Sequence, residues 1–381
     1  LADRCHEYTE AEAAMVMWAF GNRRHILHRL WPDGKTSADL DRFLSAMSKA
    51  VMRKLDAGTI RSGEALAKIL VGFGHLVPFA ERGREYQFLF EKIAELFAHG
   101  LKSRGAGSSF GIQDASWIAT HLAWSNNRCE AYDAFFLALS DALPSLLSRG
   151  YIPQNIANIA WGASEYCISC HMNSSATSVY REGWHHRIFD GIATLNFERM
   201  AHLQTIDLAM IASALAKGGY AHFAFLQQLS HRLIDLLPEQ SGEPGRRSHD
   251  VALLAWSYAT STAAVGPALL THTFELLSAA AVHIVSAFTL QGLCLLLWSL
   301  AVADFDHPEL LRLCRDRLIE VFDAEGAVSK DGRAMQQLHQ WHLWVEFELK
   351  RPELQLPDLM REEMRQFARK ETDKPTVSRL Q

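Results

Sequence analysis

Apolar residues recur along this chain at helical spacing, and one apolar stretch returns over most of its length. Its copies are runs rich in Ala, Leu and Ile that end in tryptophan and small residues, as in "NIANIAWGASEY" and "DVALLAWSYATS". Apolar positions three and four residues apart predict helices with a buried face. The copies are anchored on Trp18, Val71, Trp124, Trp161, Ser213, Trp256, Trp298 and, in a divergent last copy, Trp341.

The spacing of the anchors predicts a repeat architecture. Successive anchors lie 53, 53, 37, 52, 43, 42 and 43 residues apart, a period of about 40 with insertions. The segments between them also have helical patterns, for example "YQFLFEKIAELFAHGL" and "FAFLQQLSHRLIDLLP". A unit of two antiparallel helices cannot bury both faces alone, so neighbouring units must stack. We therefore expect an all-α fold, an α-solenoid (superhelix) of about seven or eight helix–turn–helix repeats.

The repeats divide the chain into two regions. Residues 1–349 carry the anchors and are expected to form the solenoid, and residues 350–381 form a charged C-terminal tail. Small residues that follow anchors should let neighbouring helices approach closely: Ala19, Ser125, Gly162, Ser257 and Ser299. The anchor tryptophans are predicted to lie in the core, because aromatic residues among Leu, Ile and Ala are usually buried.

Polar residues stand where the later anchor helices should begin. They are Gln113-Asp114, Pro153-Gln154-Asn155, Asp207, Ser248-His249-Asp250 and Thr289. Side chains of these types accept hydrogen bonds from free amides, and acidic groups suit the helix dipole there. They are predicted to be N-caps or first-turn residues.

The least charged segment lies between Asp250 and Asp304, where Glu275 is the only charged residue. Part of it is long enough to cross a bilayer, but polar residues interrupt its middle. Central units of a solenoid are covered on both sides. We therefore expect two buried helices with a break near residues 286–289, and no membrane span.

Composition restricts the kinds of partner and chemistry. The chain has 381 residues, 49% hydrophobic and 21% charged, with a formal net charge of −5. Nucleic-acid binding would therefore depend on local basic patches. Six cysteines are too few for a disulfide-stapled domain and favour a reducing compartment. Motifs for nucleotide binding, zinc proteolysis and serine hydrolysis are absent from the sequence, so we expect no enzymatic activity, no cofactor and no small-molecule substrate.

One motif suggests metal chemistry. Cys167, Cys170 and His171 form C-x-x-C-H, the pattern of covalent haem c attachment, and could also begin a zinc site with the histidines of "GWHHRIF". The repeat places these residues at the end of a helix beside a turn, and no second closely spaced cysteine pair exists. The three residues are the candidate metal ligands, but we expect no bound metal.

The anchor helices resemble those of the octotricopeptide and heptatricopeptide helical-repeat families, which accompany RAP domains in organellar proteins. The copies closest to the family pattern are "QNIANIAWGASEY", "DLAMIASALAKGGY" and "HDVALLAWSYATS", and the resemblance spans roughly residues 10 to 348. It implies import into mitochondria, or into plastids, and binding of single-stranded RNA or a place in an organellar ribosome. The residues after Leu349 do not have the RAP pattern.

Two kinds of residue are candidates for RNA contact. Shared positions at the starts of anchor helices would form a ladder along one surface, and local basic clusters could hold phosphate. The candidates are Gln154, Asn155, Asn158, His249, Gln291 and His121 for the ladder, and Arg23, Arg24, Arg29, Arg181, Arg187, Arg246 and Arg247 for the clusters.

The function expected from the sequence is a non-enzymatic scaffold in an organellar ribonucleoprotein. The favoured role is a structural or assembly component of the mitochondrial ribosome that contacts ribosomal RNA and neighbouring proteins. One alternative is a free organellar RNA-binding factor for transcript processing or stability. A second alternative is a scaffold with protein partners alone.

Overall fold

The computed structural model describes residues 2–23, 38–77, 84–103, 110–125, 128–172, 183–195, 202–220, 222–236, 244–325 and 332–372. These residues are mostly helical, and none of them lies in a β-strand. The chain divides into two compact units, residues 1–195 and 196–381. The all-α prediction is confirmed for the described residues. The predicted repeat region, residues 1–349, spans both units.

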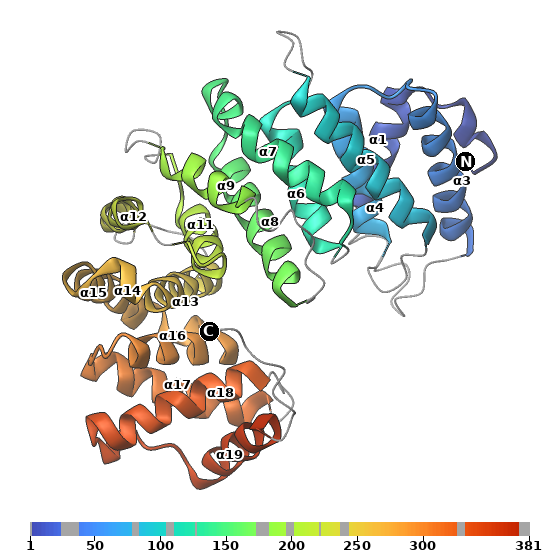
Figure 1. Cartoon of the computed structure of the whole chain (residues 1–381). Coiled ribbons are helices and arrows are strands. Elements are labelled where there is room, and N and C mark those ends of the chain that lie inside the picture. The colour runs from blue at the N-terminus through green and yellow to red at the C-terminus, as the bar shows by residue number, and fades with distance from the viewer. Residues whose placement is uncertain are drawn as a thin grey trace. The chain divides into compact units, whose positions relative to one another are not determined.

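Unit 1 contains two layers of helices (Figure 1). The first layer, called the A layer, consists of α1 (Glu10–Asn22), α4 (Gly63–Leu76), α6 (Ile112–Trp124) and α8 (Pro153–Met172), each packed on the next. The B layer consists of α3 (Ala38–Asp56), α5 (Arg84–Lys102), α7 (Glu130–Ser148) and α9 (Trp184–Ala193), again in succession. The 3₁₀ segment η1 (Ala2–Glu7) packs on α3. Consecutive A and B helices pair, as the repeat predicts.

Unit 2 has the same arrangement. Its A layer is α11 (Thr205–Lys217), α13 (Pro244–Thr260), α16 (Leu290–Val302) and α18 (Gly332–Leu343). Its second helices are α12 (Phe223–Leu236), α15 (Pro267–Ile284), α17 (Pro308–Glu325) and α19 (Asp358–Thr372). Short elements join them: α14 (Thr262–Val265), η4 (Val285–Ala287), the π-helical η6 (Trp344–Leu349) and η7 (Pro352–Leu354).

The predicted break in the uncharged segment is confirmed. Helix α15 ends at Ile284, a 3₁₀ turn follows, and Thr289 caps α16 by accepting a hydrogen bond from the amide of Gly292 at 3.2 Å. Among the described residues, Pro267–Ala287 is the one helical segment long and apolar enough to cross a membrane, judged by length and composition. In the structure α15 packs against α12, α13 and α17.

The predicted C-terminal tail is part of unit 2 rather than a separate region. Helix α19 packs on α18, and Leu354, Met360 and Met364 are almost completely buried. Arg351 also pairs with Asp306, before α17. The high content of charged residues concealed an amphipathic helix, because its apolar face is narrow. A boundary at residue 349 therefore does not mark the end of the folded unit.

Several A-layer helices begin with the same capping arrangement, in which a polar side chain stands at N3, the third residue of the helix. The side chains of Glu12, Asp114, Asn155 and Asp207 each accept a hydrogen bond from the amide three residues earlier, at 2.7, 3.1, 3.1 and 3.0 Å. This satisfies an amide that the helix leaves free. The prediction of first-turn residues is confirmed for Asp114, Asn155 and Asp207. It is wrong for residues 248–250, since α13 already begins at Pro244.

Glycines let A-layer helices meet main chain against main chain. A Cβ added to Gly72 of α4 would lie 2.4 Å from the carbonyl oxygen of Met17 in α1. A Cβ added to Gly162 of α8 would lie 2.8 Å from the carbonyl carbon and oxygen of Ala119 in α6. Such distances are far inside van der Waals contact, so no larger residue fits without moving a helix. The close approach predicted at Gly162 is confirmed, whereas Ala19 is exposed.

Replacing Gly162 by alanine should therefore destabilise unit 1 although alanine favours helices. We expect the free energy of unfolding to fall by about 1–3 kcal/mol, the usual cost of overpacking. The matched control is Gly245→Ala in the first turn of α13, where nothing lies within 4 Å of the added Cβ. It should be neutral or stabilising by up to about 1 kcal/mol. Equal effects of the two substitutions in urea unfolding would contradict the packing argument.

Candidate nucleic-acid interface

Each A-layer helix presents one stripe of side chains to solvent. Its other sides pack against the B layer and one or two neighbouring A helices, so the stripe is what remains. The stripe lies one residue before and three, six and ten residues after a reference residue, which is one face of a helix. The reference is the third helical residue (N3) in α6, α8 and α16, and Asp250 in α13. The stripes are Gln113, Trp117, Thr120 and Trp124 on α6; Gln154, Asn158, Trp161 and Glu165 on α8; His249, Leu253, Trp256 and Thr260 on α13; and Gln291, Leu295, Trp298 and Val302 on α16.

The anchor tryptophans lie on these stripes, so the prediction that they form the core is wrong for most of them. Trp124 is 44% exposed, and Trp18, Trp161, Trp256 and Trp298 are half-buried. In the divergent last copy, by contrast, Trp341 is fully buried. Counted from N3, the residue of α6 that corresponds to Trp161 of α8 is Thr120 and not Trp124. The helices bury Ala, Leu and small residues on three sides, and the tryptophan occupies the fourth.

In unit 1 the stripes carry two groups of aromatic rings, together called the aromatic strip: Trp18 with Trp117, and His75 with Trp124 and Trp161. The ring centroids of Trp18 and Trp117 are 4.7 Å apart, and those of Trp124 and Trp161 are 5.8 Å apart in an edge-to-face arrangement. His75 belongs to the second group, with its ring centroid 6.3 Å from that of Trp124. The rings of the strip come from the four A-layer helices α1, α4, α6 and α8.

Half-exposed aromatic rings held by neighbouring rings offer flat surfaces to a planar ligand. Base–aromatic stacking is the common element of sequence-tolerant binding of single-stranded nucleic acid, and each ring accepts any base. The rings are fixed by mutual contacts, so little side-chain entropy would be lost on binding. The strip can therefore support stacking of several bases in succession.

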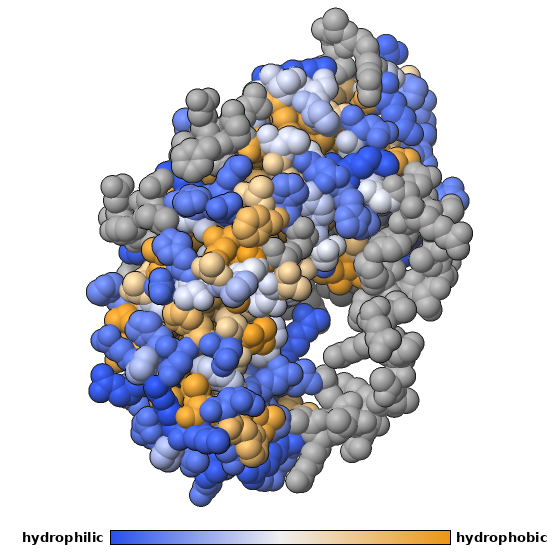
Figure 2. Space-filling model, turned by 60° about the vertical axis from the view of Figure 1, so that its left-hand side comes forward, coloured by the Kyte–Doolittle hydropathy of each residue, from blue (hydrophilic) through white to orange (hydrophobic). Residues whose placement is uncertain are grey.

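In unit 2 the corresponding stripes are more aliphatic, and charged side chains are few on them. They carry Ile206, Met210, Leu253, Leu295 and Val302 beside Trp256 and Trp298. Trp298 donates its indole N–H to the amide oxygen of Gln340 on α18, so its polar end is satisfied within the layer. Figure 2 shows hydrophobic patches among hydrophilic side chains on the face that it views. Neighbouring apolar side chains of this kind are typical of protein–protein contact.

A groove of about 970 Å³ lies beside the aromatic strip in unit 1 and is called the capping groove. It runs along the N-terminal ends of α4, α6 and α8 and the C-terminal end of α7. Its lining includes Lys68, Glu64, Phe110, Gln113, Asp114, Trp117, Arg149, Tyr151 and Ile152. Trp117 belongs to both the groove and the strip, so the two surfaces are continuous.

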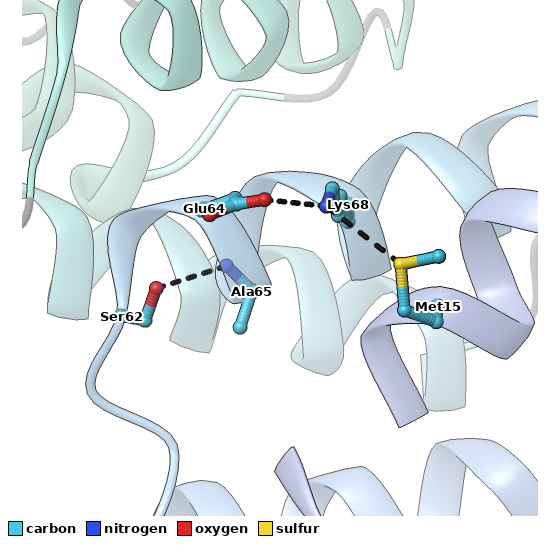
Figure 3. A network of polar contacts seen from close by, with 5 residues as sticks. All are labelled: Met15, Ser62, Glu64, Ala65 and Lys68. Carbon is cyan, nitrogen blue, oxygen red and sulfur yellow. Dashed lines mark hydrogen bonds and ion pairs between the residues drawn. The ribbon is translucent and has the colours of Figure 1, made fainter. Parts of the chain in front are cut away.

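The two cations of the capping groove, Lys68 and Arg149, differ in their ion pairing. Lys68 pairs with Glu64 at 2.5 Å and lies 3.8 Å from the sulfur of Met15 on α1, and its side chain is only 18% exposed (Figure 3). Arg149 is exposed, and no carboxylate lies within ion-pair distance of its guanidinium among the described residues. Glu64 therefore offsets the charge of Lys68, whereas the charge of Arg149 is available to a ligand.

The carboxylate of Asp114 lies at the floor of the groove. Burial raises its pKa, and the hydrogen bond from the amide of Gly111 opposes that shift. Asp207 has the same capping role in unit 2 and the same cause of a raised pKa. At the equivalent position of α8, Asn155 makes the same hydrogen bond without a charge, so capping and not charge is what this position requires.

The structure separates the predicted ladder residues into two groups. Gln154, Asn158, His249 and Gln291 lie on the stripes, as a ladder requires. Asn155 and His121 are 4% and 5% exposed and face inward. Asn155 caps α8 and donates to Ser116 at 3.3 Å. The His121 ring lies against Gly74 of α4, and its Nδ1 is 2.9 Å from the carbonyl oxygen of Trp117. These two side chains are therefore unavailable to a base.

Three residues of the predicted basic clusters have described side chains: Arg23, Arg187 and Arg247. Arg23 is exposed at the end of α1, and Arg247 is half-buried in α13. Arg187 lies on α9 in the B layer, where it bonds to Ser140 at 3.3 Å and pairs with Asp141 at 3.6 Å. Arg24, Arg29 and Arg181, and the side chain of Arg246, lie outside the described residues. Sequence reasoning missed Lys68, Trp117 and Arg149, although the three-residue spacing of Trp117 from Asp114 indicated its stripe.

The C-x-x-C-H motif lies in the last turns of α8, which continues to Met172 and is longer than the repeat predicted. Cys167 is buried and forms no disulfide. The side chains of Cys170 and His171 lie outside the described residues. Elsewhere in the described chain, no three His, Cys, Asp or Glu side chains gather as metal ligands.

Comparison with known sequences adds no assignment: no protein-family model and no curated protein matches the chain.

Asp114→Asn should keep the capping hydrogen bond and remove the buried charge. A pKa raised in the folded state stabilises the fold below the unfolded pKa, near 3.8, and this stabilisation is lost as pH rises through the folded pKa. The variant should therefore match the parent at low pH and be equally or more stable at pH 7. Asp114→Ala should lose about 1 kcal/mol. Urea unfolding between pH 3 and 8 measures the stability of both variants. An Asn variant as unstable as the Ala variant would show that the position requires the charge and not the capping hydrogen bond.

Metal analysis tests the C-x-x-C-H motif. We expect purified protein to contain no stoichiometric zinc or haem, and Cys170→Ser to leave its thermal stability unchanged. One bound zinc per chain, lost in that variant together with stability, would contradict this expectation, since structural zinc contributes folding free energy.

Proposed function

We propose that this chain is a non-enzymatic α-solenoid scaffold of an organellar ribonucleoprotein and binds single-stranded RNA through the aromatic strip of unit 1. The observation that carries the proposal is the strip itself, two groups of partly exposed rings contributed by the A-layer helices of unit 1. Two-layer helix pairs in both units support the solenoid. The resemblance to octotricopeptide-type repeats supports RNA as the ligand and the mitochondrion as the compartment.

The electrostatics favour binding inside an assembly over tight binding by the isolated chain. With a formal net charge of −5, the chain as a whole repels phosphate. Stacking must then contribute most of the affinity, and other components must hold the RNA nearby. A structural or assembly component of the mitochondrial ribosome fits this requirement, with ribosomal RNA as the bound strand. The aliphatic stripes of unit 2 fit contact with neighbouring proteins of the same assembly.

A scaffold also agrees with the state of the described cysteines. Burial raises the pKa of the Cys129 thiol to about 11 and that of Cys314 to about 12. A catalytic thiol requires the opposite shift, because the thiolate is the nucleophile. These groups are therefore suited to the core and not to covalent chemistry.

Replacing Trp124 and Trp161 together by alanine tests the RNA function. Each stacked base contributes about 1–3 kcal/mol, so affinity for a labelled ten-nucleotide RNA should fall by at least about ten-fold. The matched control replaces Trp256 and Trp298 on the stripes of unit 2 and should change affinity little. Fluorescence anisotropy at low salt measures binding, and circular dichroism checks folding.

The outcomes separate the alternatives. A parent chain that binds no RNA at low salt would refute RNA binding, and cofractionation with an RNA-free complex would then indicate a purely protein scaffold. Sedimentation of the native protein with a ribosomal subunit of mitochondria supports the ribosomal role. Sedimentation with a messenger RNA fraction indicates a free transcript-binding factor instead.

A further inference from the structure

We propose that the capping groove of unit 1 binds one or two nucleotides of the RNA strand, with a base on Trp117 and a backbone phosphate on Arg149. This inference rests on the proposed function and assigns it a specific subsite. The groove shares Trp117 with the strip, but Trp18, His75, Trp124 and Trp161 do not line it.

The size of the groove suits such a ligand. Its volume of about 970 Å³ lies near the upper end of the range of about 300–1,000 Å³ for sites that hold small molecules. One nucleotide is a ligand of this class, so the groove has room for one or two but not for a folded RNA. It is also open to solvent on one side, as a site on a continuous strand must be.

The aromatic side of the groove continues an existing stack. Trp117 is half-buried, and its ring centroid is 4.7 Å from that of Trp18, which fixes the indole. A base entering the groove would lie against a ring whose position does not change. Gln113 is exposed on the same helix one turn earlier, so its amide can bond to a base edge.

The charged side of the groove favours a phosphodiester. Lys68 is offset by Glu64, and the Asp114 carboxylate is engaged by the amide of Gly111, so Arg149 remains as the cation available to a ligand. Guanidinium binds phosphate oxygens in a bidentate manner. An acidic peptide would also satisfy Arg149 but offers no planar group for Trp117. The combination therefore favours a nucleotide over an acidic peptide.

Two variants of the full chain test the two contacts. Arg149→Gln should weaken binding of fluorescein-labelled ten-nucleotide oligouridylate and oligoadenylate. It should also reduce the slope of log affinity against log salt by about 0.7, the effect of one lost phosphate contact on a single strand. Trp117→Leu should weaken binding by about five-fold or more, whereas Trp117→Phe, which keeps a stacking face, should stay close to the parent.

The matched charge control is Arg42→Gln on α3, an exposed arginine outside the groove whose carboxylate neighbour Asp39 lies 3.8 Å away. It should leave both affinity and salt slope unchanged. In the parent chain, photo-crosslinking with 4-thiouridine oligonucleotides should label the segments around Trp117 or Tyr151. This measurement does not depend on whether a variant folds.

The outcomes distinguish failure of the subsite from failure of the function. RNA binding by the parent that Arg149→Gln and Trp117→Leu leave unchanged, with crosslinks elsewhere on the strip, would overturn the subsite and leave the function. Absence of RNA binding by the parent would overturn both. Displacement of the RNA by decaglutamate at the same concentration as by unlabelled RNA would show that the groove recognises an acidic peptide.

Discussion

Main-chain contact between A-layer helices is the constraint on which the rest of the structure depends. At Gly72 and Gly162 a neighbouring helix backbone occupies the space that a Cβ would need. Helices this close can place only small residues between them, so Ala, Gly and Ser fill the flanks. Ser257 and Ser299 are small enough for these positions, and their hydroxyls donate hydrogen bonds to the carbonyl oxygens of Leu253 and Leu295, one turn back in their own helices. Large side chains then have two directions left, toward the B layer or toward solvent.

That division explains why the anchor tryptophans are half-exposed. The inward direction is taken by Leu, Ile and Phe that pack on the B layer, so the anchor tryptophans other than Trp341 project outward. A tryptophan on one stripe can then reach the ring on the next helix, because the helices lie so near each other. The same close packing that stabilises the fold therefore builds the surface that is proposed to bind RNA. Loss of the glycines would separate the rings as well as weaken the layer.

Much of the fold could be predicted from sequence because it depends on local signals. Helical periodicity, the recurrence of about 40 residues and the polar residues at helix starts identified the helices, their pairing and the break before Thr289. Burial of the tryptophans could not be predicted correctly, since hydrophobicity alone does not distinguish the inward face from the outward one. The correct register was present in Asp114, Asn155 and Asp207, whose position relative to the stripe is constant. The tryptophan is easier to recognise in the sequence, but its position relative to N3 differs by about one helical turn between copies.

The candidate site was harder to predict because it combines segments that are distant in sequence. Arg149, at the end of α7, lines the same groove as Trp117 of α6 and Lys68 of α4 only after the two layers have formed. Nothing in its sequence neighbourhood, "SLLSRGYIP", indicates that its charge has no carboxylate near it. Conversely, Arg187 looked basic in sequence, but Asp141 on the preceding B-layer helix pairs with it. Pairing across helices decides which cations a ligand can use.

The two units share an architecture but differ in the chemistry of their stripes, and this difference bears on the proposed scaffold function. Stripes of unit 1 combine aromatic rings with glutamine, asparagine and histidine, groups that can stack and hydrogen-bond with bases. Stripes of unit 2 also carry tryptophan, His249 and Gln291, but more of their positions are Leu, Ile, Met and Val, which gain free energy by losing contact with water. A chain that only bound RNA would have no use for the second surface, and a chain that only bound proteins would have little need of the first. A component that fixes an RNA strand against neighbouring proteins requires both surfaces.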